Sequence, residues 1–226
     1  MKARLILIVF LGLIPLLSYA QGTVNFSAGA TSSTRIWTNS VPGGPSTGQI
    51  SGAGNYFFAL FVAPTSIGTN YSLTSRLEDP TFYGFQLVNS PVGTYGTNTA
   101  AVGRMNGNPT TDGTPVAGYA PGTSANFVVV GWSANIAGPD WNAFRPWLNF
   151  GLVKGWAGHS SVAEAVQLGG GLIPQGTIFG GAAGQASAFG LTIPITPEPS
   201  AFALAGLGAA ALVILRRRAT RIKSHD

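Results

Sequence analysis

The chain has 226 residues, a formal net charge of +5 and no cysteine, and only 8% of its residues are charged. This length accommodates one ordinary domain with targeting segments, and the lack of cysteine excludes disulfides and thiolate metal sites. The excess charge lies at the ends, because residues 21–195 hold five basic and five acidic side chains, which argues against nucleic-acid binding.

Residues 1–20 have the three parts of a secretory signal peptide. A basic start is followed by the apolar run Leu5–Leu17, and Ser18 and Ala20 supply the small residues of a cleavage site. We expect Sec export and cleavage by signal peptidase between Ala20 and Gln21. The alternative is an uncut membrane anchor, but the run is shorter than the roughly 20 residues that span a bilayer.

Residues 21–195 are predicted to form one extracytoplasmic, β-rich domain, because short apolar runs alternate with Gly, Pro, Asn and Ser turns. Two runs, Tyr56–Val62 and Phe127–Val130, are continuously apolar and indicate central strands buried on both faces. Phe189–Ile195 alternates and indicates one buried face. The predicted strands are Thr23–Phe26, Arg35–Trp37, Tyr56–Val62, Phe82–Val88, Ala100–Met105, Asn126–Ser133, Phe150–Val153 and Phe189–Ile195.

Two short helices are also predicted. Ser161–Glu164 fits a capping box that opens a helix, which Gly169 would stop. Asp140 is expected to cap a helix over Trp141–Phe144, which Pro146 would end. The fold class is therefore all-β with one or two short helices, as a two-sheet sandwich or jelly roll, with a barrel as the alternative.

Catalysis is not expected. His159, the single histidine of the domain, adjoins Ser160 and Ser161, and adjacent residues rarely give the geometry of a nucleophilic triad. We interpret His159 as a surface residue before a helix cap.

The acidic residues are interpreted as turns and caps. Glu78-Asp79 leads into Pro80 as a turn would, and Asp112-Gly113 has the same character. Two carboxylates brought together by separate strands would suit a glycoside hydrolase, which remains an alternative. We expect no metal and no cofactor, because calcium needs clustered carboxylates and Gly169–Gly171 lacks the lysine of a phosphate loop.

Four tryptophans fall within 25 residues: Trp132, Trp141, Trp147 and Trp156. We expect most of them to lie in the core of the β domain. An exposed tryptophan could stack on sugar rings, and Trp141 or Trp147, in a predicted loop beside Asp140 and Arg145, would be the candidate for carbohydrate contact.

Residues 196–226 form a third segment. Pro197-Glu198-Pro199-Ser200 precedes the apolar run Ala201–Leu215, and Arg216, Arg217 and Arg218 open a basic tail that extends to residue 226. As a transmembrane helix the run would reach about 22 Å, against a hydrocarbon core of ~30 Å. The arginines are expected to remain in the cytoplasm and to set the orientation of this helix.

These three elements resemble the PEP-CTERM sorting signal. The resemblance implies that the membrane enzyme exosortase recognises the motif and removes the tail during export, in a Gram-negative bacterium that makes exopolysaccharide. A permanent single-span anchor is the alternative. Within the body, Gln21–Phe26 and Val130–Ser133 resemble Verrucomicrobia-type PEP-CTERM proteins of unknown function.

The sequence therefore predicts an exported structural protein of the cell surface or of the exopolysaccharide-containing biofilm matrix. Its expected partners are the Sec machinery, signal peptidase, exosortase, the membrane through its C-terminal helix before processing, and exopolysaccharide. A carbohydrate-binding module is the second hypothesis, and a polysaccharide-processing hydrolase is the third.

Overall fold

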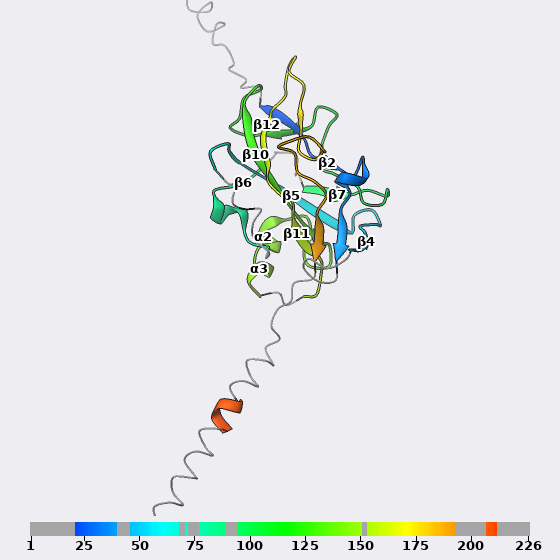
Figure 1. Ribbon diagram of the computed structural model, residues 1–226, viewed down its shortest axis with the longest axis vertical. Coiled ribbons are helices and arrows are strands. Elements are labelled where there is room, and N and C mark those ends of the chain that lie inside the picture. Colours follow the sequence, from blue (N-terminus) through cyan, green and yellow to red (C-terminus); the bar gives the residue numbers. More distant parts are fainter. Residues whose placement is uncertain are drawn as a thin grey trace, which may run out of the picture. The chain divides into compact units, whose positions relative to one another are not determined.

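The computed structural model describes residues 21–39, 46–67, 71, 77–88, 95–150, 153–192 and 207–211 (Figure 1). The chain divides into two units, residues 1–193 and 194–226. Strands dominate the described part of the first unit, which confirms the all-β prediction. In the second unit, residues 207–211 form a short helix.

The first unit is organised around two long antiparallel strands, β5 (Tyr56–Pro64) and β10 (Ser124–Ser133), which cross its middle in Figure 1. Their register runs from Ala125 opposite Pro64 to Ser133 opposite Tyr56. Every residue of β10 from Ala125 onward is buried. The predicted central strands, buried on both faces, are therefore confirmed.

The other strands extend this pair into a large sheet of order β2-β8-β7-β5-β10-β11-β14-β3-β4, with β12 paired to β10 and β6 to β5. Their bounds are β2 Ser27–Ala28, β3 Trp37–Asn39, β4 Ser46–Gln49, β6 Gln86–Leu87, β7 Tyr95–Asn98, β8 Met105–Asn106, β11 Ala157–His159, β12 Ala163–Gln167 and β14 Gly190–Thr192. A small sheet has the order β13 (Gly176–Thr177), β1 (Gly22–Asn25), β9 (Thr114–Val116).

The large sheet is curled, because its two ends are joined through Gly103. The Ile36 N–H donates to the Gly103 carbonyl over 3.0 Å, and the Gly103 N–H donates to the Ile50 carbonyl over 2.8 Å. Gly103 lies just before β8, near one end of the strand order, whereas Ile36 and Ile50 flank β3 and β4 at the other end. Glycine is required at this junction, since its φ is +76° and a Cβ would lie 2.7 Å from the Gln49 side chain.

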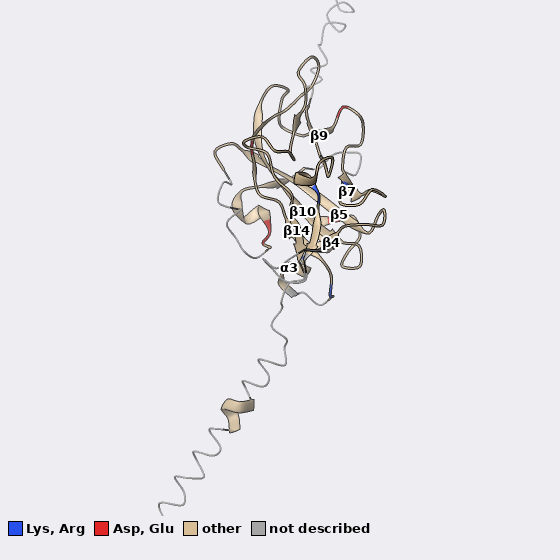
Figure 2. Ribbon diagram, turned by 45° about the vertical axis from the view of Figure 1, so that its right-hand side comes forward, with Lys and Arg blue, Asp and Glu red and all other residues tan. Residues whose placement is uncertain are grey.

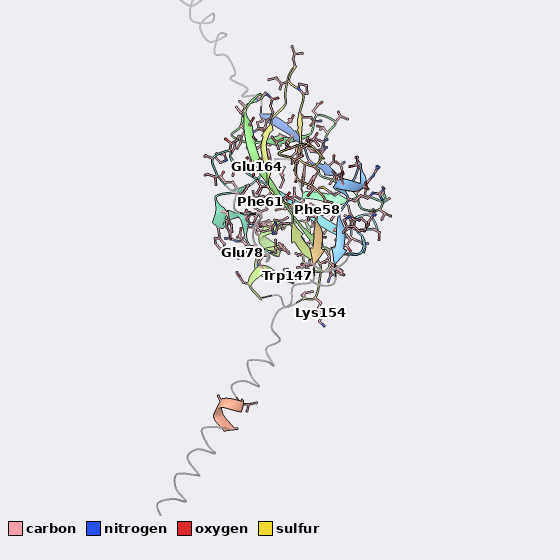
Figure 3. All side chains as sticks on the ribbon, in the orientation of Figure 1. Phe58, Phe61, Glu78, Trp147, Lys154 and Glu164 are labelled. Atoms are coloured by element: carbon pink, nitrogen blue, oxygen red, sulfur yellow. The ribbon has the colours of Figure 1, made fainter. Side chains whose placement is uncertain are left out.

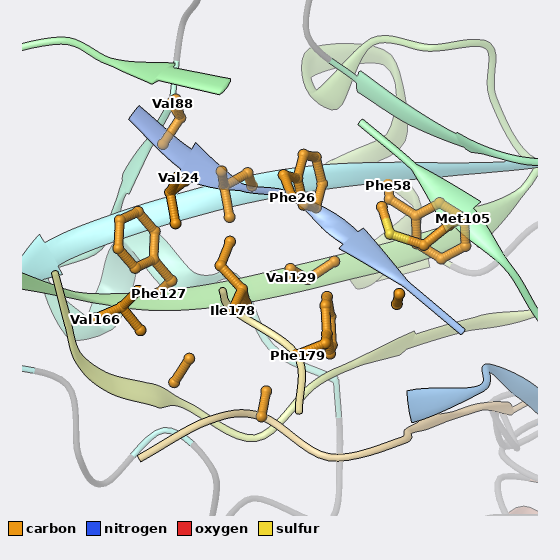
Figure 4. Close-up of a cluster of buried hydrophobic side chains, with 14 of the residues drawn as sticks. Val24, Phe26, Phe58, Val88, Met105, Phe127, Val129, Val166, Ile178 and Phe179 are labelled. Carbon is orange, nitrogen blue, oxygen red and sulfur yellow. The ribbon is translucent and has the colours of Figure 1, made fainter. Parts of the chain in front are cut away.

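Alternate side chains of β5 and β10 point to opposite faces and supply two separate cores. One core, here called the inner core, includes Phe58 of β5 and Phe127 and Val129 of β10 (Figure 4). The small sheet packs against it through Val24 and Val116.

The outer core lies on the opposite face of the same two strands. It contains Phe61 of β5 and Val130 and Trp132 of β10, together with Trp141 and Phe144. Short helical elements cover this face rather than strands. They are η3 (Pro80–Tyr83), α2 (Trp141–Phe144) and α3 (Trp147–Phe150), while η1 (Ser32–Thr34) lies before β3.

The helix predicted to open at Ser161–Glu164 is wrong, because this segment enters β12 and pairs with β10. Ala163 and Val166 join the inner core, and that burial outweighs the capping pattern. Gly169 does not stop a helix but exchanges backbone hydrogen bonds with Thr23.

Four predicted strands were also wrong in whole or in part. Arg35–Trp37 overlaps a strand only at Trp37, the first residue of β3. Phe82–Val88 begins within η3 and contributes only β6, and Ala100–Met105 is mostly a turn that leads into β8. Phe150 ends α3 instead of starting a strand. In Phe189–Ile195 the alternation holds over the described residues, with Phe189 and Leu191 buried, and residues 193–195 lie outside the described part.

Candidate functional site

Helix α2 forms where Asp140 was expected to cap it. The Asp140 side chain accepts a hydrogen bond from the Asn142 N–H over 2.9 Å, which satisfies one of the free amides of the first turn. Trp141 and Phe144 are three residues apart, so they share one face of the helix and are buried against the sheet. Asn142 and Arg145 are consequently exposed.

Aromatic contacts hold α2 on the outer face of the large sheet. The rings of Trp132 and Phe144 stack with centroids 4.6 Å apart, and Trp141 meets Phe61 edge-on at 4.8 Å. The Trp141 N–H donates to the Tyr95 hydroxyl over 2.8 Å, and burial raises the pKa of Tyr95. The position of α2 is thus fixed by close packing.

Trp141 is 3% exposed, so the expectation that it lies in an accessible loop is wrong. Its indole fills the outer core between Phe61 and Trp132, which outweighs its place in a short connecting segment. Trp147, labelled in Figure 3, is half-buried, stacks on Phe144 and donates from its indole N–H to the Val153 carbonyl over 2.7 Å. A carbohydrate contact of Trp147 stays a prediction.

Opposite α2 lies η3, which Asp79 caps. The Asp79 carboxylate accepts hydrogen bonds from the Thr81 N–H over 2.9 Å and from the Thr81 hydroxyl over 2.8 Å. Pro80 takes the first helical position, where it has no amide to leave unpaired, and Gly84 ends the turn at a φ of +84°. Phe82 is left projecting into solvent, with 77% of its surface exposed.

An ion pair joins the two elements. Arg145 Nε lies 2.5 Å from the second carboxylate oxygen of Asp79. The Asp79 side chain is 4% exposed and the Arg145 side chain 48% exposed, so one charge is buried and its partner reaches water. The prediction that Glu78-Asp79 leads into a turn agrees with this structure, but the sequence did not predict this partner.

Glu78 is held by two tyrosines. The Tyr83 hydroxyl donates to the Glu78 carboxylate, and the Tyr71 hydroxyl donates to the Glu78 carbonyl over 2.7 Å. The hydrogen bond with Glu78 raises the pKa of Tyr83, and desolvation adds to the effect. Tyr71 packs edge-on against Tyr83 with ring centroids 5.1 Å apart, so the three residues support each other.

Between η3 and the two helices lies an open groove of about 690 Å³. We call it the η3–α2 groove. It combines an exposed aromatic ring with amide, carboxylate and guanidinium groups, which can present an apolar surface and hydrogen bonds to one ligand. The described residues that line it are Leu77, Glu78, Asp79, Phe82, Asn142, Arg145, Pro146, Leu148 and Asn149.

His159 and Ser160 are committed to the fold. His159 lies half-buried in β11, with its ring 4.7 Å from the ring of Tyr71, so the expected surface position before a helix cap is wrong. The Ser160 hydroxyl donates to the Ser161 carbonyl over 2.7 Å and accepts from the Val129 N–H over 3.0 Å. Packing of β11 against β10 explains both positions.

Asp112 is exposed in the turn between Thr110 and Gly113, as its sequence Asp112-Gly113 predicts. Within the described ranges, no three His, Asp or Glu side chains gather closely enough to hold a metal ion.

Most of the predicted targeting residues lie outside the described part of the chain. Gln21 is described and exposed, whereas Ala20, Pro197–Ser200 and Arg216–Arg218 are not described. Residues 207–211, inside the predicted apolar helix, are helical. Over the described residues, none of the helices has the length and apolar character needed to cross a bilayer.

The role of Phe82, Asn142 and Asn149 in the groove was not predicted from the sequence. A signal for Phe82 was present, because Asp79-Pro80-Thr81 combines a capping residue with proline at the first helical position. The two asparagines carried no comparable signal, since exposed amides are common in loops.

Comparison with known proteins identifies the second unit only. The family model of the PEP-CTERM protein-sorting motif matches residues 196–218, which confirms the resemblance of this segment. The motif indicates an exported protein that is anchored in the membrane in transit and is then processed by exosortase. No curated protein and no solved structure matches the chain.

Proposed function

We propose that this exosortase-sorted protein is a structural component of the bacterial cell surface or extracellular matrix, where it associates with exopolysaccharide. The observation that carries the proposal is the sorting motif at residues 196–218, because it indicates that the β-rich domain is exported and sorted by exosortase. The proposed mature protein begins at Gln21 and lacks the residues beyond Pro199, and the proposed host is a Gram-negative bacterium.

The charge distribution of the domain supports this role. Charged positions are sparse along the ribbon (Figure 2). The described basic residues are Arg35, Arg104, Arg145 and Lys154, and the described acidic residues are Glu78, Asp79, Asp112, Asp140 and Glu164. A nearly neutral domain creates little long-range field, so it can lie among polysaccharides of either charge without strong repulsion.

The architecture is suited to a passive component. We propose that the two sheets form a sandwich-like body, supported by the packing of Val24 and Val116 from the small sheet into the inner core. Because side chains pack on both faces of β5 and β10, the centre of the domain is filled rather than hollow.

A non-catalytic role is part of the proposal. A glycoside hydrolase needs two carboxyl groups roughly 5–10 Å apart across a cleft, one of which gives and takes protons. In the groove, Asp79 is held by Thr81 and Arg145, and Glu78 is held by Tyr83. Both carboxylates thus have structural partners, which supports a binding or structural role over hydrolysis.

The test is made in the producing strain. Deletion of the gene is expected to lower the resistance of the matrix to shear, and deletion of exosortase is expected to have the same effect. The intact mass of the exported protein, measured by mass spectrometry, should correspond to a chain without Arg216–Asp226. A matrix of unchanged cohesion after deletion of the gene would contradict the structural role, and an attached tail would contradict processing.

Carbohydrate binding is the second candidate function. The observation that favours it is the η3–α2 groove, where Phe82 is 77% exposed beside Asn142 and Arg145. The two functions are compatible, because a matrix protein that holds polysaccharide needs a surface that recognises it.

A further inference from the structure

We propose that the η3–α2 groove binds an uncharged saccharide, with Phe82 as the stacking surface and Asn142, Arg145 and Asn149 as hydrogen-bonding groups. The proposal deepens the proposed function and rests on it for the location of the protein outside the cell. Binding itself is tested separately below.

Phe82 supplies the apolar part of the site. Its ring projects from η3 with 77% of its surface exposed and lines the groove. The C–H face of a pyranose ring is flat and apolar, so stacking on Phe82 would remove both surfaces from water. Leu77 and Leu148 are half-buried in the same lining and extend this surface.

The polar part comes from α2 and α3. Asn142 and Asn149 are exposed amides, each with an acceptor oxygen and two N–H donors. Arg145 pairs with Asp79 through Nε, and its guanidinium carries four further N–H donors in a fixed plane. Neighbouring hydroxyls of a sugar ring act as both donors and acceptors, which matches this mixture.

The charge of the groove favours an uncharged ligand. Among the described lining residues, Glu78 and Asp79 against Arg145 give a formal charge of −1. Arg145, the one cation among them, is already paired with Asp79 over 2.5 Å. A uronate or sulfate would therefore meet net repulsion without an uncommitted cation in the described lining. A sugar with only hydroxyl groups meets no such cost.

The groove has the size and rigidity of a binding site. Its volume of about 690 Å³ lies within the roughly 300–1,000 Å³ of small-molecule sites and suits a short oligosaccharide. The Asp79–Arg145 ion pair ties its walls together, and the stack of Phe144 on Trp132 fixes α2. These contacts fix the two walls of the groove relative to each other before a ligand binds.

The experiment uses the exported protein in a glycan array and then in affinity electrophoresis through gels that contain neutral β-glucan, dextran or anionic alginate. We expect retardation by a neutral glucan and none by alginate. Phe82→Ala should weaken binding at least tenfold and Asn142→Ala several-fold. Phe82→Tyr, which keeps the aromatic face, should retain binding.

Leu172→Ala is the matched control, since Leu172 is fully exposed and outside the groove lining, and its binding should equal that of the wild type. Unchanged secondary structure of Phe82→Ala by circular dichroism separates lost contact from lost folding. The proposal would be overturned if the wild type bound no neutral glycan or bound alginate more tightly than the neutral glucans. It would also be overturned if Phe82→Ala bound as tightly as the wild type.

The two proposals fail in different ways. If the protein strengthens the matrix but binds no glycan, only the proposal of saccharide binding in the η3–α2 groove is contradicted. A protein that binds glucan through Phe82, but whose deletion leaves the cohesion of the matrix unchanged, contradicts the structural role alone.

Discussion

Asp79 is a buried carboxylate with partners on two elements: it caps η3 through Thr81, and it pairs with Arg145 of the neighbouring segment. The cap is local, and loss of such a cap costs about 1 kcal/mol. The ion pair is long-range and its arginine is 48% exposed, so solvent screens it and its net contribution is smaller than for a fully buried pair.

We therefore predict that Asp79→Ala lowers the free energy of unfolding of the exported protein by about 2 kcal/mol and Arg145→Ala by about 1–2 kcal/mol, because the arginine variant leaves a buried carboxylate without its counter-charge. The loss of unfolding free energy in the double variant should be smaller than the sum of the two single losses by about 0.5–1 kcal/mol. Urea denaturation measures each value. Lys154→Ala is the control at an exposed position, and strictly additive losses would show that Asp79 and Arg145 are not coupled.

Tyr71 gives the domain a pH dependence at high pH. Burial raises the pKa of this phenol well above 10, and the charges of Asp79, Glu78 and Tyr83 add to the effect. Above pH 10 the unfolded chain loses the Tyr71 proton and the folded chain keeps it, so the stabilisation is complete below pH 10 and falls as the pH rises.

We predict that Tyr71→Phe reduces the fall in unfolding free energy above pH 10 by up to about 1.4 kcal/mol per pH unit, the value for one proton. At pH 7 it should cost about 1 kcal/mol through loss of the hydrogen bond to the Glu78 carbonyl. Denaturation at intervals from pH 7 to 11 measures both effects. A profile that parallels the wild type would rule out Tyr71 as the source.

At the residue scale, local chemistry was predictable and distant partners were not. Asp140 was identified as a cap because its acceptor oxygen needs only an amide two residues away. The Asp79–Arg145 pair joins residues on separate elements, and no local pattern predicts such a contact. Local chemistry can also mislead. The capping box at Ser161 predicted a helix, but the burial of Ala163 and Val166 in a strand overrode it.

At the scale of elements, the strands that the sequence predicted best are those with long apolar runs. Both β5 and β10 were identified because consecutive large side chains need burial on two faces. The strands β4, β7 and β9 were missed, since Ser, Thr, Gly, Asn and Pro in them read as turns. Backbone pairing places all three in sheets, and β9 in addition buries Val116 in the inner core, which a three-residue segment with a proline did not signal.

Close backbone approach explains why another short strand, β11, contains glycine. In β11, a Cβ on Gly158 would lie 2.4 Å from the Gly190 carbonyl oxygen and 3.2 Å from the Leu191 Cα. Both atoms belong to β14, which pairs with β11. The neighbouring atoms are backbone, so no side chain can rotate away to make room.

We predict that Gly158→Ala lowers the free energy of unfolding by about 1–3 kcal/mol, because the added methyl group forces β11 and β14 apart. Gly181→Ala is the matched control: a Cβ there meets nothing within 4 Å, so this variant should change stability by less than about 0.5 kcal/mol. Equal midpoints of thermal unfolding for the two variants would contradict the close approach.

At the scale of the whole molecule, charge is separated by segment. Residues 21–195 are neutral, and five of the twelve basic residues lie in 216–226. The sorting motif at 196–218 was predictable from sequence alone, because it is read as a linear string. The η3–α2 groove was not, since its lining comes from segments about sixty residues apart that only the fold brings together.

We predict that replacement of Arg216, Arg217 and Arg218 by alanine weakens membrane retention in transit or inverts the orientation of the tail, because basic residues hold a segment on the cytoplasmic side. Cell fractionation and protease accessibility of intact cells measure the two effects. Replacement of Arg35 and Arg104 in the β domain is the control for loss of charge. Unchanged fractionation and accessibility would reject the role of the arginines.

The junction at Gly103 has a consequence for contacts between exported copies of this protein. The outermost strands of an open sheet can pair with those of a neighbour and begin fibril growth. Here β2 is only two residues long. Backbone hydrogen bonds through Gly103 join the segments that flank β3, β4 and β8, so these segments do not offer free backbone groups at that point. Crowding of secreted copies should therefore leave them as separate folded units instead of joining their sheets edge to edge.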